Sequence, residues 1–184
     1  MLEQIIIFGT GGHGKVVIDA VEMQALYHIK FLVDADPIRV GSKIKNYIII
    51  SEQEAFSLAS DTELSAIVAI GHNETRKRIS HIAKCSGFKL ATIIHPASIK
   101  AVDVIIGEGS LVMPRSVINA STHIGSNVVI NTGAIIEHDC KVGDGAHIAP
   151  SATLCGGVEI GEGALVGAGA VILPNIKIGA QAVV

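Results

Sequence analysis

A six-residue repeat in the second half of the chain limits the possible folds more than any other feature. From Ile106 to Val184 an aliphatic residue occurs at every sixth position, fourteen times in succession. A small side chain precedes most of them by two positions, and Gly follows every third one. A helix repeats about every 3.6 residues and a strand about every two, so neither explains this pattern. We expect a triangular coil of three short strands per eighteen residues, with the aliphatic and small side chains inside.

The chain before His95-Pro96 has a different pattern. Short apolar runs alternate with helical segments, and Ser51 with Glu54 forms a capping box that begins a helix through Ala59. This alternation is typical of a Rossmann-like parallel α/β layer. We therefore expect an α/β domain over residues 1–95 and a β-helix over residues 96–184. The predicted strands are Ile5–Phe8, Ile29–Val33, Ala66–Ile70 and Leu90–Ile94, and a basic helix is predicted over Asn73–Ser86.

Composition excludes several classes of protein. With 49% hydrophobic residues and a net charge of -3, the chain is neither disordered nor equipped with a basic face for nucleic acid. No run approaches the roughly eighteen apolar residues of a membrane span. The three cysteines form no CxxC pair, which favours a reducing compartment. We expect a cytoplasmic protein with no membrane span.

A glycine-rich turn follows the first predicted strand. Gly9–Gly14 fits the GxGxxG pattern, and Asp34 lies twenty residues after Gly14. This pattern is typical of a dinucleotide site and keeps a nicotinamide oxidoreductase open as an alternative. The layer is short for two mononucleotide-binding halves, and Val16 stands where an ATPase loop needs a hydroxyl group. A tight turn without a ligand is the third possibility.

His138 lies between two acidic residues inside the repeat, two positions after the inward Ile136. This position predicts a corner of the coil, where a side chain points to solvent. A carboxylate that accepts from one imidazole nitrogen makes the other a better general base. A surface histidine between two solvated acids is the alternative. Gly156, eighteen residues later, is expected one turn of the coil above His138, about 4.8 Å away.

The whole chain resembles one family of bacterial hexapeptide-repeat sugar acyltransferases, the sialic-acid O-acetyltransferases and the UDP-4-amino-sugar N-acetyltransferases of bacillosamine-type pathways. The resemblance rests on Ile6–Gly14, Ala69–Asn73, Ile94–Pro96 and Asn131–Cys140. It implies a left-handed parallel β-helix, which the spacing alone does not show. It also implies acetyl-CoA as co-substrate and a homotrimer with sites between subunits.

The resemblance further assigns roles to residues. It implies His138 as catalytic base with Asp139 as its partner, and acetyl-CoA contacts at His147, Gly156 and Ala168. The remaining candidate residues are expected to line the binding site for the nucleotide part of the sugar substrate. Val33 departs from the family, whose members often carry a second acid beside Asp34. The candidates for the nucleotide-sugar site are Gly11, Gly12, His13, Asp34, Gly71 and Asn73.

Together these features predict an acetyl-CoA-dependent acetyltransferase that N-acetylates a UDP-amino sugar for surface glycans. A sialic-acid-type O-acetyltransferase, a non-catalytic β-helix scaffold and a nucleotide-binding oxidoreductase remain alternatives. We expect no metal, because the spacings of His123, His138 and His147 place them on different faces.

The Arg76–Arg78 run is expected on a solvated helix face, and Cys140 and Cys155 inside the coil. The repeat reaches Val184 without a polar cap, so we expect further chain or a neighbouring subunit to complete the acetyl-CoA site.

Overall fold

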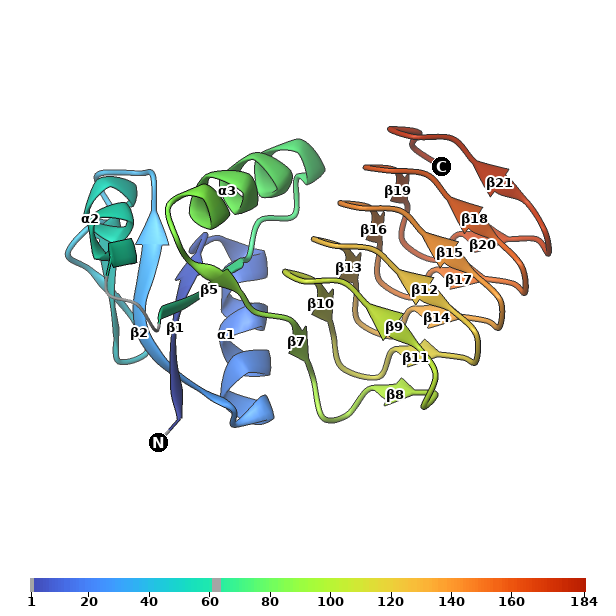
Figure 1. Ribbon diagram of the computed structural model, residues 1–184, viewed down its shortest axis with the longest axis horizontal. Helices are drawn as coiled ribbons and strands as arrows, with labels where there is room; N and C mark the ends of the chain where they lie inside the picture. The colour runs from blue at the N-terminus through green and yellow to red at the C-terminus, as the bar shows by residue number, and fades with distance from the viewer. Residues whose placement is uncertain (1, 61–63) are drawn as a thin grey trace. The chain divides into compact units, whose positions relative to one another are not determined.

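The computed structural model describes residues 2–60 and 64–184 and divides into two compact units, one up to Ala91 and one from Thr92 (Figure 1). The strand predicted over Leu90–Ile94 was wrong as a single element. Strand β6 (Lys89–Leu90) belongs to the first unit, and β7 (Ile93–Ile94) pairs with the repeats of the second. Within the described residues, no helix has the length and apolar character needed to cross a membrane.

The first unit is a six-stranded sheet with helices between its strands, as the alternating pattern predicts. The strand order is β3-β4-β2-β1-β5-β6, and all neighbours run parallel except β3 and β4. Strands β3 and β4 form a hairpin that was not predicted. The turn between them places Lys45 in the left-handed region, at φ 50°. The capping box at Ser51 is confirmed. The remaining elements are β1 (Glu3–Phe8), α1 (Gly12–Gln24), β2 (Tyr27–Asp34), β3 (Lys43–Ile44), β4 (Tyr47–Ser51), α2 (Glu52–Ser57), a 3-10 turn (Leu58–Ser60), β5 (Leu64–Val68) and α3 (Asn73–Cys85).

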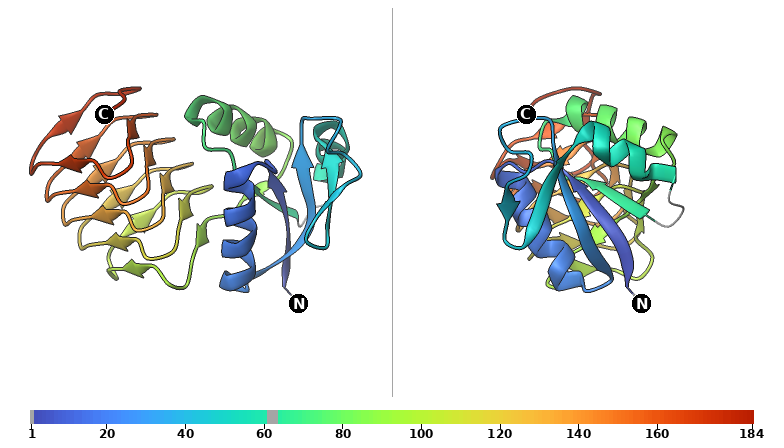
Figure 2. Two further views of the ribbon diagram at one scale, coloured as in Figure 1. Left: turned by 180° about the vertical axis from the view of Figure 1, so that it is seen from behind. Right: turned by 90° about the vertical axis from the view of Figure 1, so that its left-hand side faces the viewer.

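Alternate residues of β1 face the two sides of this sheet. Ile6 and Phe8 pack in one buried cluster with residues of α2 and α3, and the Phe8 ring stacks on Phe56 at 5.4 Å between centroids. Ile5 and Ile7 are also fully buried and point to the opposite face, where α1 packs (Figure 2). Helices on both faces leave the carboxyl ends of the parallel strands free to form a site.

The second unit is a left-handed parallel β-helix of two-residue strands arranged in three faces (Figure 1). Each strand except the last three pairs in parallel with the strand eighteen residues further along the chain, as Val117 does with Ile135. The first face contains β7, β10 (Leu111–Val112), β13 (Val129–Ile130), β16 (His147–Ile148) and β19 (Leu165–Val166). The second contains β8 (Ile99–Lys100), β11 (Val117–Ile118), β14 (Ile135–Ile136), β17 (Thr153–Leu154) and β20 (Val171–Ile172). The third contains β9 (Ile105–Ile106), β12 (His123–Ile124), β15 (Lys141–Val142), β18 (Glu159–Ile160) and β21 (Lys177–Ile178).

The core of the β-helix confirms the prediction that the aliphatic and small side chains of the repeat lie inside the coil. The aliphatic residues from Val112 to Ile172 are buried, as are most of the small residues two positions before them, including Cys140. The buried hydroxyl groups of Ser110 and Thr122 donate to backbone carbonyls of the neighbouring turn, Ser110 to that of Gly125 at 2.8 Å, whereas Ser116 donates to the Met113 carbonyl of its own turn. The coil begins two strands before the one that contains Ile106. The repeat was not recognised in this first turn because exposed Lys100 occupies one of its aliphatic positions.

Candidate functional site

A cavity of about 420 Å³ lies at the carboxyl ends of β1, β2 and β5 in the first unit. Strand β1 lies between β2 and β5 in the sheet, at the point where the strand order reverses direction, and such a position is the usual ligand site of an open α/β sheet. The cavity brings together most of the residues proposed for the nucleotide sugar. Its lining includes Thr10, Gly11, Gly12, His13, Asp34, Gly71, Thr75 and Arg78.

The glycines of the turn have two different functions. A Cβ atom on Gly14 would overlap the carbonyl oxygen of Gly9, so Gly14 lets α1 pack closely on the end of β1. A Cβ on Gly11 or Gly12 would meet nothing within 4 Å. Packing therefore does not require glycine at these two positions, and the open space beside them allows a ligand to approach the backbone.

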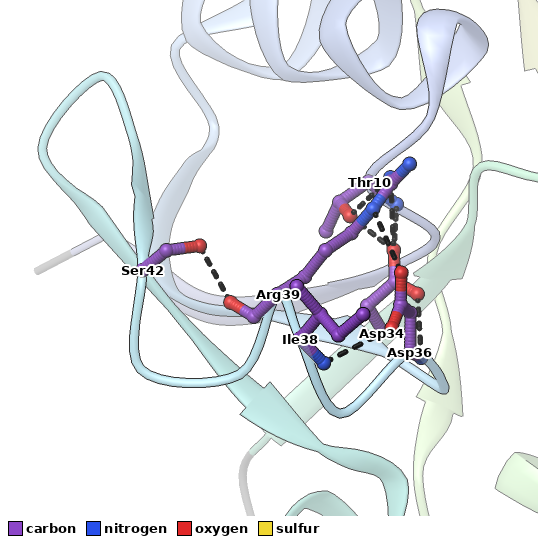
Figure 3. Close-up of polar contacts among 6 residues, drawn as sticks. All are labelled: Thr10, Asp34, Asp36, Ile38, Arg39 and Ser42. Atoms are coloured by element: carbon purple, nitrogen blue, oxygen red, sulfur yellow. Dashed lines mark hydrogen bonds and ion pairs between the residues drawn. The ribbon is translucent and has the colours of Figure 1, made fainter.

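Asp34 is held by a polar network at the end of β2, as Figure 3 shows. The backbone N–H of Thr10 donates to its carboxylate at 3.2 Å, the Thr10 hydroxyl donates to the same oxygen, and Arg39 lies 3.5 Å away. Partial burial raises the pKa of Asp34, but the hydrogen bonds from Thr10 and Asp36 and the charge of Arg39 outweigh it and leave the pKa below its usual value. Arg39, which the sequence did not single out, thus belongs to the rim of the site.

Two of the predicted positions differ in how they contribute to the cavity. His13 lines it and is partly buried; burial and the nearby positive charge of Arg76 lower the pKa of His13. Asn73 does not line it, because its side-chain oxygen accepts from Arg76 at 2.9 Å. The expectation of a solvated Arg76–Arg78 run was wrong for Arg76, which is fully buried, whereas Arg78 is exposed. In a run of basic residues on a helix, the sequence does not show which of them lies on the face that points into the protein.

His138 lies on the corner between the second and third faces of the β-helix, after β14 and before β15. Its side chain is 64% exposed, and its Nδ1 lies 2.7 Å from the Asp139 carboxylate. The Asp139 backbone has φ 61°, a turn conformation that aims its side chain back at the preceding ring. The pair leaves Nε2 of the imidazole available to a substrate.

Gly156 lies one turn of the coil above and makes room for this ring. A Cβ atom at Gly156 would come within 2.6 Å of Cε1 and 2.7 Å of Nε2 of His138. Among the residues that the structure describes, none accepts a hydrogen bond from the Gly156 N–H. The imidazole therefore lies directly against a glycine whose amide is free to bind another group.

Two residues in the turn below, neither of which was predicted as a site residue, hold the segment before His138. The side-chain amide of Asn119 donates to the Glu137 carboxylate at 2.9 Å, and the Thr122 hydroxyl donates to the Glu137 carbonyl at 3.0 Å. Both contacts join positions about one coil turn apart. Counting eighteen residues back from Glu137 would have found Asn119.

His147 and Ala168 lie away from the His138 corner within one chain. His147 is on β16 in the first face, where Asn131 contacts its Nε2 at 3.0 Å, and Ala168 follows β19 of the same face. The structure therefore brings His138, Asp139 and Gly156 together but not His147 and Ala168 with them. Among residues 2–60 and 64–184, no three His, Cys, Asp or Glu side chains gather as metal ligands.

Two family descriptions match the chain, one for each unit. Residues 4–83 match the PglD N-terminal domain. Residues 103–138 and 121–156 match the bacterial transferase hexapeptide of six repeats.

Two named relatives are similar in sequence to part of the chain. The chain is 32% identical over 135 residues to a GDP-perosamine N-acetyltransferase of Escherichia coli O157:H7, covering 72% of this chain and 61% of the relative. It is 33% identical over 119 residues to a UDP-N-acetylbacillosamine N-acetyltransferase of Bacillus subtilis, covering 61% of this chain and 52% of the relative. The matched segments thus span between half and two thirds of these two relatives.

A solved structure is similar over the entire chain. PerB from Caulobacter crescentus, determined in complex with CoA and GDP-perosamine, superposes with a TM-score of 0.91 at 36% identity, covering 100% of this chain and 86% of PerB. By fold, by both domain matches and by this full-length similarity, the chain belongs to the family of bacterial hexapeptide-repeat sugar acyltransferases that carry a PglD N-terminal domain.

Proposed function

We propose that this protein transfers the acetyl group of acetyl-CoA to the amino group of a nucleotide-activated sugar. The observation that carries the proposal is the exposed His138–Asp139 pair, whose imidazole lies against Gly156. The relatives named for N-acetylation of GDP-perosamine and UDP-N-acetylbacillosamine support the same activity. The product would enter surface-glycan synthesis.

In the proposed reaction, His138 acts as general base. The carboxylate of Asp139 accepts from Nδ1–H, which fixes the tautomer with a free lone pair on Nε2. Nε2 removes a proton from the sugar amine as its nitrogen attacks the thioester carbonyl. The C–S bond then breaks, and the imidazolium returns its proton to the leaving CoA thiolate. The free N–H of Gly156 is placed to stabilise the oxyanion of the tetrahedral intermediate.

The nucleotide part of the substrate is assigned to the cavity of the first unit. Open space at Gly11 and Gly12, the amino-terminal end of α1 and the cationic Arg78 in the lining suit a diphosphate. Asp34 lies at the end of β2, where a carboxylate binds a ribose hydroxyl in similar folds. His13 and Gly71 complete the lining that we assign to the sugar nucleotide.

The positions of His147 and Ala168 support a homotrimer. If both contact acetyl-CoA, they must come from a subunit other than the one that supplies His138, because they lie on a different face of the prism. The second face also presents an outward column that is apolar except at Thr153 and is suited to subunit contact; it comprises Ile99, Val117, Ile135, Thr153 and Val171. Light scattering should give a mass of three 19.1 kDa chains; a single-chain mass at micromolar concentration would contradict the assembly.

We also place the reaction in the cytoplasm. None of Cys85, Cys140 and Cys155 forms a disulfide. Free thiols are typical of a reducing compartment.

Release of CoA thiol, measured with a panel of UDP- and GDP-linked amino sugars, tests the proposed activity. The same sugars with a hydroxyl group in place of the amine, and free sialic acid, serve as the O-acetylation controls. We expect turnover only with an amine. Turnover with hydroxyl acceptors alone would favour the O-acetyltransferase alternative, and binding of a nicotinamide cofactor without thiol release would favour an oxidoreductase.

A further inference from the structure

Arg76 is the largest fully buried side chain of the protein, and neither the sequence pattern nor the proposed reaction accounts for it. It lies on the first turn of α3, next to the β5–α3 turn. Its Nη1 donates to the carbonyl oxygens of Ile70 and Gly71, each at 3.1 Å, and its Nη2 donates to Asn73 at 2.9 Å. The guanidinium group of Arg76 thus links two residues shortly before α3, Ile70 and Gly71, to the first residue of the helix, Asn73.

These contacts orient the peptide groups of the turn. In a trans peptide the carbonyl of one residue and the N–H of the next point in opposite directions. Because Arg76 draws in the carbonyls of Ile70 and Gly71, the N–H groups of Gly71 and His72 point away from it. Ile70 and Gly71 are both part of the cavity lining, so Arg76 determines the shape of one wall.

Arg76 also contributes its charge to the same cavity. Burial lowers the pKa of Arg76 to about 10, so the group remains protonated at neutral pH. Burial and the positive charge of Arg76 together lower the pKa of His13, which lines the same cavity. A cation in a wall of low dielectric constant attracts an anionic ligand more strongly than an exposed one does.

We propose that Arg76 is a positioning residue for the nucleotide site: it holds the β5–α3 turn in its ligand-binding shape and supplies a buried positive charge that favours the diphosphate. The inference rests on the proposed function, because it assigns the anionic ligand of the first unit to a nucleoside diphosphate. Arg76 acts through the turn and is not assigned a direct contact with substrate.

Calorimetric titration of UDP, GDP and acetyl-CoA into the full chain tests the inference with three variants. Arg76→Met removes the charge and the three hydrogen bonds, so the dissociation constant of the preferred nucleotide should rise about tenfold to a hundredfold. Arg76→Lys keeps the charge but not the fork of donors, and should fall between wild type and Arg76→Met. Lys84→Met removes one charge from an exposed position of the same helix and should bind like wild type.

The kinetic signature separates positioning from a general loss of structure. We expect KM for the nucleotide sugar to rise in Arg76→Lys, with KM for acetyl-CoA and kcat at saturating sugar unchanged. An equal loss of affinity for the nucleotide and for acetyl-CoA would overturn the inference. Wild-type nucleotide affinity in both Arg76→Lys and Arg76→Met would also overturn it. If Arg76→Met does not fold, Arg76→Lys decides alone. If wild type binds acetyl-CoA but neither UDP nor GDP, the nucleotide part of the proposed function fails first, and the inference fails with it.

Discussion

The two units present their polar groups in different ways. In the β-helix, every corner repeats after eighteen residues, and one corner becomes a candidate active site by carrying His138 and Asp139 below Gly156. In the α/β unit, the cavity is assembled from the ends of β1, β2 and β5, segments that are far apart in the chain. In the proposed function, the β-helix therefore supplies a few reactive side chains, whereas the α/β unit supplies a cavity wall of backbone groups and side chains from several elements. Substitutions should have large, local effects on turnover in the first case and smaller effects on affinity in the second.

The largest expected effect is that of His138→Ala. Loss of a general base should lower kcat by roughly a hundredfold to ten-thousandfold. The side chain is 64% exposed, so the melting temperature should change little. Asp139→Asn should lower kcat less than His138→Ala does, because the imidazole remains in place. His147→Ala should mainly raise KM for acetyl-CoA. Wild-type turnover in His138→Ala would leave the fold intact and refute the mechanism.

The next effect is that of Gly156→Ala, which tests whether the ring must lie against a glycine. The added methyl group would meet Cε1 of His138 at 2.6 Å and displace the imidazole. Displacement of a catalytic group by about 1 Å costs roughly a hundredfold in kcat. Gly179→Ala is the matched control, because a Cβ there meets nothing within 4 Å. Equal kcat values in the two variants would show that the contact with Gly156 is not needed for turnover.

A smaller effect is expected for Gly11→Val in the α/β unit. A Cβ at this position has open space, so the fold should persist, but the branched side chain would keep a diphosphate from the backbone. Affinity for the nucleotide should fall about tenfold, as for one lost hydrogen bond to a charged group. Affinity for acetyl-CoA should not change. Calorimetry with both ligands measures the difference, and equal weakening would refute the division of labour between the units.

Gly14→Ala provides the structural contrast to Gly11→Val. Its Cβ would overlap the Gly9 carbonyl, so the variant should lose stability by about 1–3 kcal/mol, the usual cost of overpacking. Thermal unfolding without ligand distinguishes the two glycines.

The smallest effect concerns the pH dependence of stability that Asp34 contributes. Its pKa is lower in the folded protein than the usual value, so the folded state favours the charged carboxylate at neutral pH. This stabilisation is fully present above the unfolded pKa of about 4 and is lost as pH falls through the lower folded value. Urea unfolding of wild type and Asp34→Asn should differ by about 1 kcal/mol at pH 7 and converge towards pH 3. A difference that stays constant with pH would contradict this role.

The hexapeptide repeat alone predicts a coil of short strands and the corner position of His138, and the family resemblance adds its role as base. A fixed period ties each residue to a face or a corner, so His138, Asp139 and Gly156 can be placed by counting. The same counting overlooked the first turn, where Lys100 breaks the aliphatic pattern at an exposed end. For the α/β unit, the alternating pattern predicted β1, β2, β5 and the helices, but it missed the β3–β4 hairpin and merged β6 with β7.

How the cavity in the α/β unit is built could not be predicted from local sequence patterns. Arg39 contacts Asp34 across a loop, and Arg76 is buried beneath the β5–α3 turn although its neighbours in the sequence are basic. Local patterns record the spacing of apolar residues, and they do not record which carbonyl groups a turn directs inward. The burial of Arg76 follows from the hydrogen bonds that those carbonyls and Asn73 accept, which exist only once β5 and α3 have packed together.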